Sequence, residues 1–182
     1  MSLTFITGAP GSGKSAVTNE IASRGFAICD TDDPSRTGRA GWHNLETGNY
    51  VAGFNELQVT EDLLVTHIWK LTDTAIHEFR AMSQTEQVYL CGRLRDPQPL
   101  TAISNYLVFL TVEDGTIADR LTARAKIPGE VEWGKEKWQV ERSIVVNRQI
   151  ENEYRDLGAI MINAEQSVSA VVDDILKNTA SI

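Results

Sequence analysis

The sequence predicts an α/β fold, in which a five-stranded parallel β-sheet lies between two layers of helices. Short apolar segments typical of strands alternate along the chain with longer segments of helical periodicity. One strand-like segment, residues 106–112, is apolar at nearly every position, as expected for a strand buried on both faces of a parallel sheet. A length of 182 residues suits one domain, so we expect residues 1–182 to form a single domain.

The first half of the chain contains two predicted strands, at residues 3–7 and 26–29, with a glycine-rich segment and a helix between them. Residues 34–56 are rich in Gly, Ser, Thr and Asn, so regular structure there should be short. From Thr60 to Met82, apolar residues recur every three or four positions. This spacing predicts one long helix with Thr60 as its N-cap.

The second half alternates strands and helices in the same way. We expect strands at residues 87–91, 106–112 and 159–163. We expect helices at about residues 114–125 and 136–157, followed by a last helix that Ser167 caps. Ligands of such sheets bind beyond the carboxyl ends of the strands, so the loops that follow the strands are the candidate site.

The strongest motif is the glycine-rich segment at residues 8–15. It fits the phosphate-binding pattern G-x-x-x-x-G-K-[ST] and lies between a strand-like and a helix-like segment, as that motif requires. Glycines let successive backbone N–H groups point at a phosphate, and the N-terminus of the following helix adds a positive dipole. A glycine-rich turn without a ligand is the alternative. The predicted nucleotide-binding residues of this loop are Gly8, Ala9, Pro10, Gly11, Ser12, Gly13, Lys14, Ser15 and Ala16.

Two side chains of the loop have specific predicted roles, for which ATP and Mg²⁺ are the expected cofactors. Lys14 is expected to contact the β- and γ-phosphates and to act in catalysis, while the Ser15 hydroxyl is expected to ligate Mg²⁺.

Four groups of residues together resemble the P-loop kinases of small molecules, which include nucleoside monophosphate kinases and shikimate kinase. These groups are the phosphate loop, Asp30-x-Asp32 after the second strand, Gly92-Arg93 after the third, and Asp119-Arg120-x-x-x-Arg124 after the fourth. The Asp spacing is similar to that of shikimate kinase, and the Arg spacing to the start of the adenylate kinase lid. The resemblance implies a three-layer P-loop NTPase fold with strand order 2-3-1-4-5 and a short lid, although no single member is matched throughout.

Arg120 and Arg124 are four residues apart, so they share one face of the predicted helix. In the resembled kinases the first arginine packs on the adenine and the second contacts the transferring phosphate, which implies a nucleotide-binding role for Arg120 and a catalytic role for Arg124. A planar, permanently charged guanidinium suits both tasks. The alternative is a solvated helix face on which Arg120 pairs with a neighbouring carboxylate.

The acceptor side is predicted from the loops after the second and third strands. Asp30 and Asp32 share a face of an extended segment, so one could hold Mg²⁺, directly or through water, while the other acts on the substrate hydroxyl. We assign Asp30 to the metal and Asp32 to catalysis, and expect both to bind the acceptor. Gly92 and Arg93 are further candidate acceptor-binding residues. Ordinary turn chemistry around Pro34 and a solvent-facing loop are the alternatives.

Two further segments are expected to cover the site. Residues 126–135 have the length and glycine content of a short lid, and residues 34–82 lie where the resembled kinases cover the acceptor. Trp42, Trp133 and Trp138 fall in or beside these segments, where they could contact a ligand or pack against other side chains.

The composition limits the class of partner. The formal net charge of −8 argues against a nucleic acid as a partner. There is no signal segment and no apolar segment long enough to span a bilayer, so we expect a cytoplasmic protein without a membrane partner. Cys29 and Cys91 lie in apolar strand-like segments and are expected to be buried free thiols. The oligomeric state is left open.

These observations together predict an enzyme that moves the γ-phosphoryl group of ATP to a small-molecule acceptor, namely a nucleotide, nucleoside, sugar or hydroxy acid. The alternative is a regulatory NTPase that binds a nucleotide without a small-molecule acceptor. The third predicted strand ends without the carboxylate that many P-loop proteins place there, which keeps this alternative open.

Overall fold

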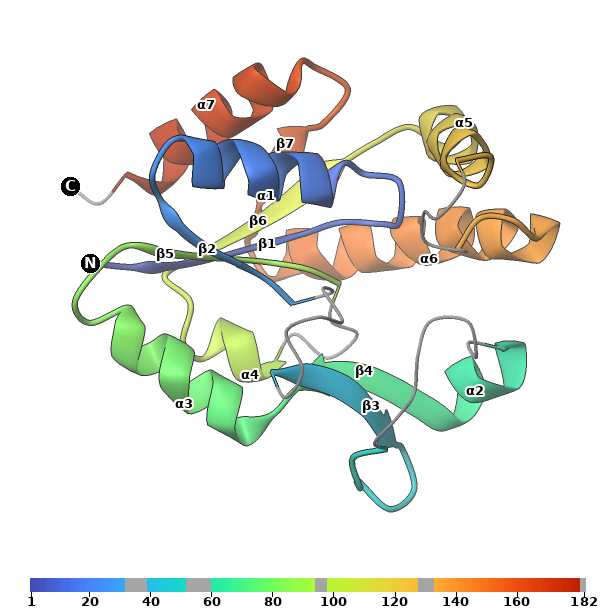
Figure 1. Cartoon of the computed structure of the whole chain (residues 1–182), viewed down its shortest axis with the longest axis horizontal. Coiled ribbons are helices and arrows are strands. Elements are labelled where there is room, and N and C mark those ends of the chain that lie inside the picture. The colour runs from blue at the N-terminus through green and yellow to red at the C-terminus, as the bar shows by residue number, and fades with distance from the viewer. Residues whose placement is uncertain (32–38, 52–59, 94–97, 128–132, 181–182) are drawn as a thin grey trace.

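A parallel β-sheet forms the centre of the molecule in a computed structural model of the chain (Figure 1), which describes residues 1–31, 39–51, 60–93, 98–127 and 133–180. Its strands are β1 (Leu3–Thr7), β2 (Ala27–Asp30), β5 (Val88–Cys91), β6 (Tyr106–Thr111) and β7 (Ile160–Asn163). They are arranged in the order β2-β5-β1-β6-β7, and every pairing is parallel. Numbered among themselves these five strands have the order 2-3-1-4-5, as predicted, and the labels differ because the described residues form two further strands outside this sheet.

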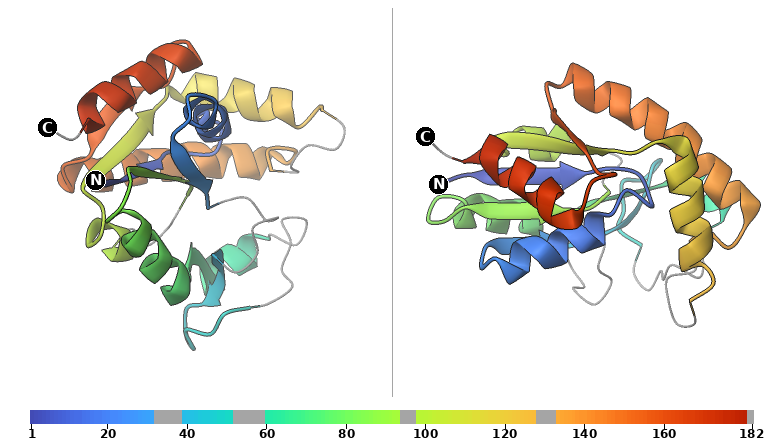
Figure 2. Two further views of the ribbon diagram at one scale, coloured as in Figure 1. Left: turned by 60° about the vertical axis from the view of Figure 1, so that its left-hand side comes forward. Right: turned by 90° about the horizontal axis from the view of Figure 1, so that it is seen from above.

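Helices cover both faces of the sheet (Figures 1 and 2). One face carries α1 (Lys14–Ser23) and α7 (Val168–Thr179), and the other carries α3 (Asp73–Met82), α4 (Gln98–Thr101) and α6 (Lys137–Asp156). Each layer encloses its own apolar core, with Ile21 and Val172 in the first core and Phe79 and Phe109 in the second. The α/β fold with three layers is therefore confirmed. The remaining long helix, α5 (Asp114–Arg124), packs against α6.

Strand β1 lies at the middle of the sheet and is buried along all five residues. Its neighbours are β5 on one side and β6 on the other, so both edges of β1 are hydrogen-bonded. The carboxyl end of β1, where the glycine-rich segment begins, is thus held from two sides.

The single long helix expected from Thr60 to Met82 is wrong. The structure has α2 (Glu61–Thr66), then β4 (His67–Leu71), then α3. Strand β4 pairs antiparallel with β3 (Ala40–Asn44), and Trp42 packs edge-on against Trp69 with ring centroids 5.6 Å apart. Aromatic and β-branched residues in β4 favour a strand, although their apolar spacing also matches a helix.

Threonine caps mark where the two helices on either side of β4 begin. The Thr60 hydroxyl accepts a hydrogen bond from the Leu63 N–H at 3.2 Å, which confirms the predicted cap, and Thr72 does the same for Ala75 at 3.3 Å. The second cap was missed because the apolar period runs through it. Strand β3 is only five residues long, in agreement with the short structure expected for residues 34–56.

Two smaller expectations concern the cysteines and the membrane. Cys29 and Cys91 are both buried free thiols, as predicted. Among the helices of the described residues, none combines the length and the apolar composition that a membrane span requires.

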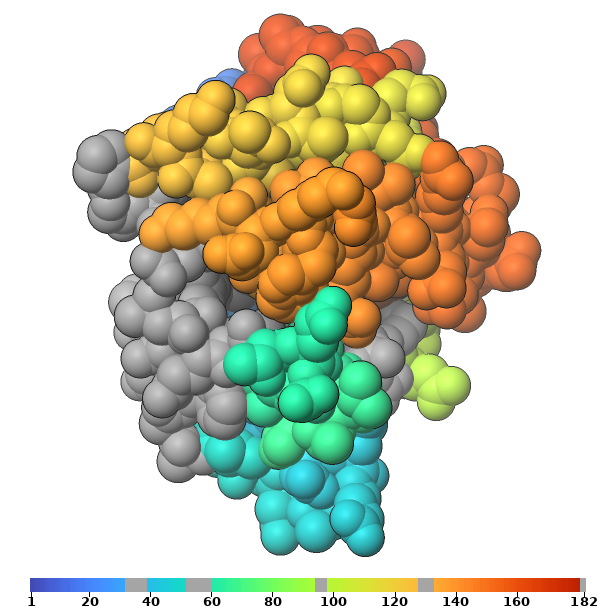
Figure 3. Space-filling view, turned by 90° about the vertical axis from the view of Figure 1, so that its right-hand side faces the viewer, coloured from blue at the N-terminus to red at the C-terminus, as the bar shows by residue number. Residues whose placement is uncertain are grey.

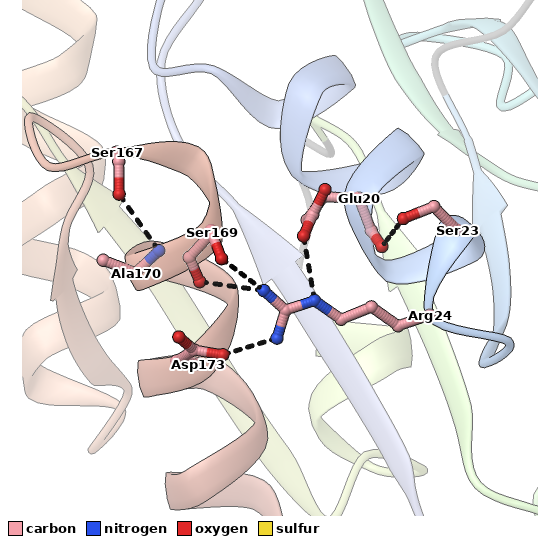
Figure 4. Close-up of polar contacts among 7 residues, drawn as sticks. All are labelled: Glu20, Ser23, Arg24, Ser167, Ser169, Ala170 and Asp173. Carbon is pink, nitrogen blue, oxygen red and sulfur yellow. Dashed lines mark hydrogen bonds and ion pairs between the residues drawn. The ribbon is translucent and has the colours of Figure 1, made fainter.

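Arg24 links the two helices on one face of the sheet (Figure 4). Arg24 is the C-cap of α1, and its guanidinium donates to Glu20 of α1 at 2.9 Å, to the Asp173 carboxylate of α7 at 2.5 Å, and to the Ser169 hydroxyl of α7 at 2.9 Å. The hydrogen bond to Asp173, followed by the one to Glu20, raises the pKa of Arg24. The guanidinium fork therefore connects helices that are far apart in the chain.

We expect Arg24→Met to lower the melting temperature by a few degrees at low salt, and by less in about 1 M salt, because screening weakens exposed ion pairs. Thermal melts at both salt concentrations measure this. Arg155→Met is the matched control, since Arg155 pairs only with Glu151 within α6 among the described contacts. Equal shifts for the two variants would contradict the role of Arg24 as a link between helices.

Candidate nucleotide-binding site

The glycine-rich segment joins the end of β1 to the start of α1 and lies directly against the sheet. A Cβ atom added at Gly8 would lie 2.7 Å from the Ser12 Oγ and 3.0 Å from the Leu110 carbonyl oxygen of β6, which leaves no room for a side chain. Gly11 and Gly13 have φ of 87° and 95°, in the left-handed region that favours glycine. The conformation of a phosphate-binding loop thus depends on these three glycines.

Lys14 is the first residue of α1, and its side chain turns back over the loop. Its Nζ donates to the carbonyl oxygens of Gly8 at 2.9 Å and Ala9 at 3.0 Å. Ser15 and Ala16 follow in the first turn of the helix and are exposed. The ammonium group therefore lies at the loop, and the Ser15 hydroxyl lies at the open N-terminus of α1.

Other loop residues are packed to different depths. Ala9 and Ser12 are buried, Pro10 is half-buried, and the Ser12 amide donates to the Ala9 carbonyl at 3.0 Å. Within the described residues the buried Ser12 Oγ has no hydrogen-bond partner. Leaving a buried hydroxyl without a partner costs on the order of 1 kcal/mol or more, which is the kind of feature found at functional sites.

Arg120, on α5, contacts the loop directly. Its guanidinium donates to the Gly11 carbonyl at 3.2 Å and to the Ala164 carbonyl, in the loop after β7, at 3.0 Å. The same guanidinium lies 3.7 Å from where a Cβ of Gly13 would be. The structure therefore brings Arg120 together with the phosphate loop.

Arg124 lies one turn farther along α5 and has a different partner. Its Nη2 donates to the Trp133 carbonyl at 3.2 Å. The structure thus places Arg124 beside the end of the lid-like segment, of which residues 128–132 lie outside the described residues. Trp133 and Trp138 pack edge-on against each other, with ring centroids 5.5 Å apart.

Glu165, which the sequence did not suggest, fixes the start of α5. Its Oε1 accepts a hydrogen bond from the Glu113 amide at 3.3 Å and from the Thr116 hydroxyl at 2.6 Å. A carboxylate at the N-terminus of a helix stabilises it through the helix dipole. Only its position just after a predicted strand could have indicated Glu165 in advance.

The loops after β2 and β5 lie side by side at the same edge of the sheet. Asp30 is opposite Cys91 in the parallel pairing, and the Thr31 amide donates to the Cys91 carbonyl at 2.7 Å. The Gly92 amide donates to the Ile6 carbonyl of β1 at 3.1 Å. Asp30 and Gly92 are thus brought to the edge from which the phosphate loop starts, with half-buried Arg93 next in sequence. Asp32 lies outside the described residues.

Arg39 is a second residue that the sequence did not suggest. Its guanidinium donates to the Cys29 sulfur at 3.3 Å, lies 5.3 Å from the centroid of the Phe79 ring, and pairs with Glu78 at 3.4 Å. The bond to Cys29 contributes most to raising the pKa of Arg39. These contacts join the start of β3 to the end of β2 and to α3.

A cavity of about 410 Å³ lies away from the phosphate loop, between the ends of β6 and β7 and the helix α6. Of its lining residues, Arg148 pairs with Asp114, and Glu165 accepts from Thr116 outside the cavity, so its charged side chains are partly engaged. A site for a triphosphate is better supported at the loop, where backbone N–H groups, Lys14 and Arg120 converge.

Comparison with solved structures agrees with this fold. A deoxyadenosine kinase from M. mycoides with bound dATP superposes with a TM-score of 0.58, over 100% of both chains and at 12% sequence identity. Identity this low supports the fold alone, which is the P-loop kinase fold that the sequence resembles. No curated protein matches the sequence.

A family model also matches the sequence. The model of the AAA domain matches residues 5–153, which include the phosphate loop, Asp30, Gly92 and both arginines of α5. Because the match spans most of the sequence, the chain belongs to the AAA domain family.

Proposed function

We propose that the protein transfers the γ-phosphoryl group of ATP to a small-molecule acceptor. One observation carries this proposal: the side chains of Lys14 and Arg120 both contact the phosphate loop, which starts at the edge of the sheet where Asp30 and Gly92 also lie. Donor and acceptor groups of a phosphoryl transfer must meet within a few ångströms, and a shared edge of the sheet supports such a meeting.

The loop and the two arginines form the donor side. Backbone N–H groups between Gly8 and Ala16, other than at Pro10, bind the phosphates, and the Lys14 ammonium exchanges its carbonyl partners for β- and γ-phosphate oxygens. Arg120 packs on the adenine, and Arg124 contacts the transferring phosphoryl group. Fixed positive groups at these positions stabilise the charge that develops on the phosphoryl oxygens in the transition state.

Magnesium fits the donor set at this edge, because the Ser15 hydroxyl and the Asp30 carboxylate are hard oxygen ligands. Ser15 is exposed in the first turn of α1 and Asp30 is half-buried at the end of β2. Asp30 takes part directly or through water. When bound, the ion neutralises charge on the β- and γ-phosphates.

The acceptor side consists of Asp30, Asp32, Gly92 and Arg93, with Asp32 orienting the acceptor hydroxyl or accepting its proton. We propose that residues 34–82 cover the acceptor and that residues 126–135 form a lid, both within one domain of residues 1–182. The M. mycoides protein of the same fold is a deoxyadenosine kinase, so nucleosides are the first acceptors to test.

A regulatory NTPase without an acceptor is the second candidate. It is favoured by the end of β5, where Cys91 and Gly92 stand in place of a carboxylate. The two candidates differ in whether ADP release depends on an acceptor.

A panel of nucleosides, nucleotides, sugars and hydroxy acids separates them. With ATP and Mg²⁺ present, we expect one class to raise the rate of ADP release well above the rate without acceptor. Coupled detection of ADP measures this rate, and the phosphorylated acceptor is then identified by mass. ATP binding without any acceptor-dependent release would favour the regulatory NTPase.

We expect Lys14→Ala to abolish the thermal stabilisation of the protein by ATP and Mg²⁺. A ligand at a hundred times its Kd stabilises the folded state by about 2.7 kcal/mol, which is a shift of several degrees for a chain of this length. Melting curves with and without nucleotide measure the shift. Lys137→Ala is the control, since Lys137 is exposed at the start of α6 and should leave the shift unchanged. An intact shift in Lys14→Ala would contradict the assignment of the loop.

We expect Asp32→Asn to leave ATP binding intact and to lower the rate of transfer by a factor of about 10²–10⁴, the usual contribution of a general base. The amide keeps the size of the carboxylate but cannot accept the proton. Transfer is measured with the acceptor from the panel, and binding from the melting shift. Undiminished transfer would remove Asp32 from the reaction.

A further inference from the structure

We propose that Gln139 and Ser143 of α6 are positioning residues that orient Arg124 through the turn at Trp133 and Gly134. This inference rests on the proposed function, in which Arg124 contacts the transferring phosphoryl group. It assigns a task to the start of α6, which lies next to α5 on one face of the molecule (Figure 3).

The orientation of the Arg124 guanidinium depends on the Trp133 carbonyl. The hydrogen bond from Nη2 to this oxygen measures 3.2 Å, and Arg124 is half-buried. Its Nε is fully buried and finds no acceptor among the described residues. Because a guanidinium is a rigid planar fork, fixing one of its nitrogens sets the direction of the other donors. The position of the Trp133 carbonyl therefore decides where Arg124 points.

Two buried side chains of α6 hold that carbonyl in place. The Trp133 indole N–H donates to the Ser143 hydroxyl at 3.0 Å, and the Ser143 hydroxyl donates to the Gln139 carbonyl at 2.7 Å. The Gly134 amide donates to the Gln139 Oε1 at 2.8 Å. Trp133 is thus held by its indole and Gly134 by its amide. The Trp133 carbonyl, which lies between these two groups, has little freedom.

Gly134 fits the turn closely against α5. Its φ is 107°, a conformation that favours glycine, and an added Cβ would lie 3.0 Å from the carbonyl oxygen of Leu121. Leu121 precedes Arg124 by three residues on the same helix. The turn therefore packs directly against the part of α5 that carries Arg124.

Gln139 and Ser143 are polar at buried positions of α6, which indicates a role in hydrogen bonding as well as in packing. Gln139 is 9% exposed and Ser143 is 1% exposed, and they are one helical turn apart on one face of α6. Buried polar groups cost free energy unless they are hydrogen-bonded, and apolar side chains of similar volume would pack without that cost. Gln139 and Ser143 instead hydrogen-bond the turn that orients Arg124.

A double-mutant cycle tests the inference. Trp133→Phe keeps an aromatic ring but removes the indole donor, and Ser143→Ala removes its acceptor. With the acceptor from the panel, we expect each to lower kcat by roughly tenfold to a hundredfold, as misplacing a catalytic group does, with little change in the KM of the acceptor. In an Arg124→Ala background, neither change should lower kcat further. Additive losses, or losses confined to KM, would overturn the proposal.

Variants of Gln139 and Trp138 provide a further test and a control. Gln139→Glu keeps an oxygen acceptor for the Gly134 amide and should retain most of kcat, whereas Gln139→Met should not. Trp138→Phe removes the same indole nitrogen from the neighbouring ring and should leave kcat unchanged. Circular dichroism confirms that each variant is folded. Equal losses in Gln139→Glu and Gln139→Met would count against orientation by the hydrogen bond.

A binding measurement separates failure of this inference from failure of the proposed function. Absence of transfer in the wild-type protein for every acceptor contradicts the proposed function. The ratio of the affinities for ATP and ADP, from calorimetry, still reports the contact of Arg124 with the γ-phosphate. We expect Arg124→Ala and Trp133→Phe to lower this ratio, and the double variant to lower it no further. An unchanged ratio in either single variant would overturn the inference.

Discussion

The contact between the phosphate loop and the backbone of β6 is the constraint on which the rest of the site depends. Gly8 approaches the Leu110 carbonyl so closely that no Cβ fits between them. Strand β1 cannot move to make room, because it is buried and paired on both edges. The loop must therefore leave the sheet at one fixed point, and this point determines where α1 begins.

Backbone carbonyls hold two positive side chains of the site among the described contacts. Lys14 donates to two carbonyls of the loop, and Arg120 donates to a third, that of Gly11. Each of these carbonyls positions a cation without adding a negative charge, and the cations lie at the loop of a chain with net charge −8. Phosphate oxygens then form charge-assisted hydrogen bonds, which are stronger than those to the carbonyls they replace.

Most of the sheet could be predicted from the sequence, because a strand buried on both faces has a simple apolar signature and alternation with helices determines the topology. Strand β4 could not be predicted, since residues 67–71 continue an apolar period that suits a helix and only the pairing with β3 makes them a strand. Pairing between distant segments is not a local property of the sequence.

The site, like the sheet, has features that could be predicted from the sequence and features that could not. Arg120 contacts the loop, and its role in nucleotide binding stays a prediction. The contact of Arg124 with the Trp133 carbonyl and that of Glu165 with α5 could not be predicted, because each joins segments whose proximity is a result of folding. A motif indicates which residues have the required chemistry, and the tertiary structure decides which of them meet.

Helix α6 shows why a hydrophobic period alone misses such contacts. The apolar positions Val140 and Ile144 are only half-buried, whereas the buried positions beside them include Gln139 and Ser143. A search for apolar periodicity therefore selects the flank of the buried face and passes over its centre. Polar residues at the centre of a buried face must find partners within the fold. For Ser143 and Gln139 those partners are the Trp133 indole and the Gly134 amide, so the start of α6 holds the turn at residues 133–134.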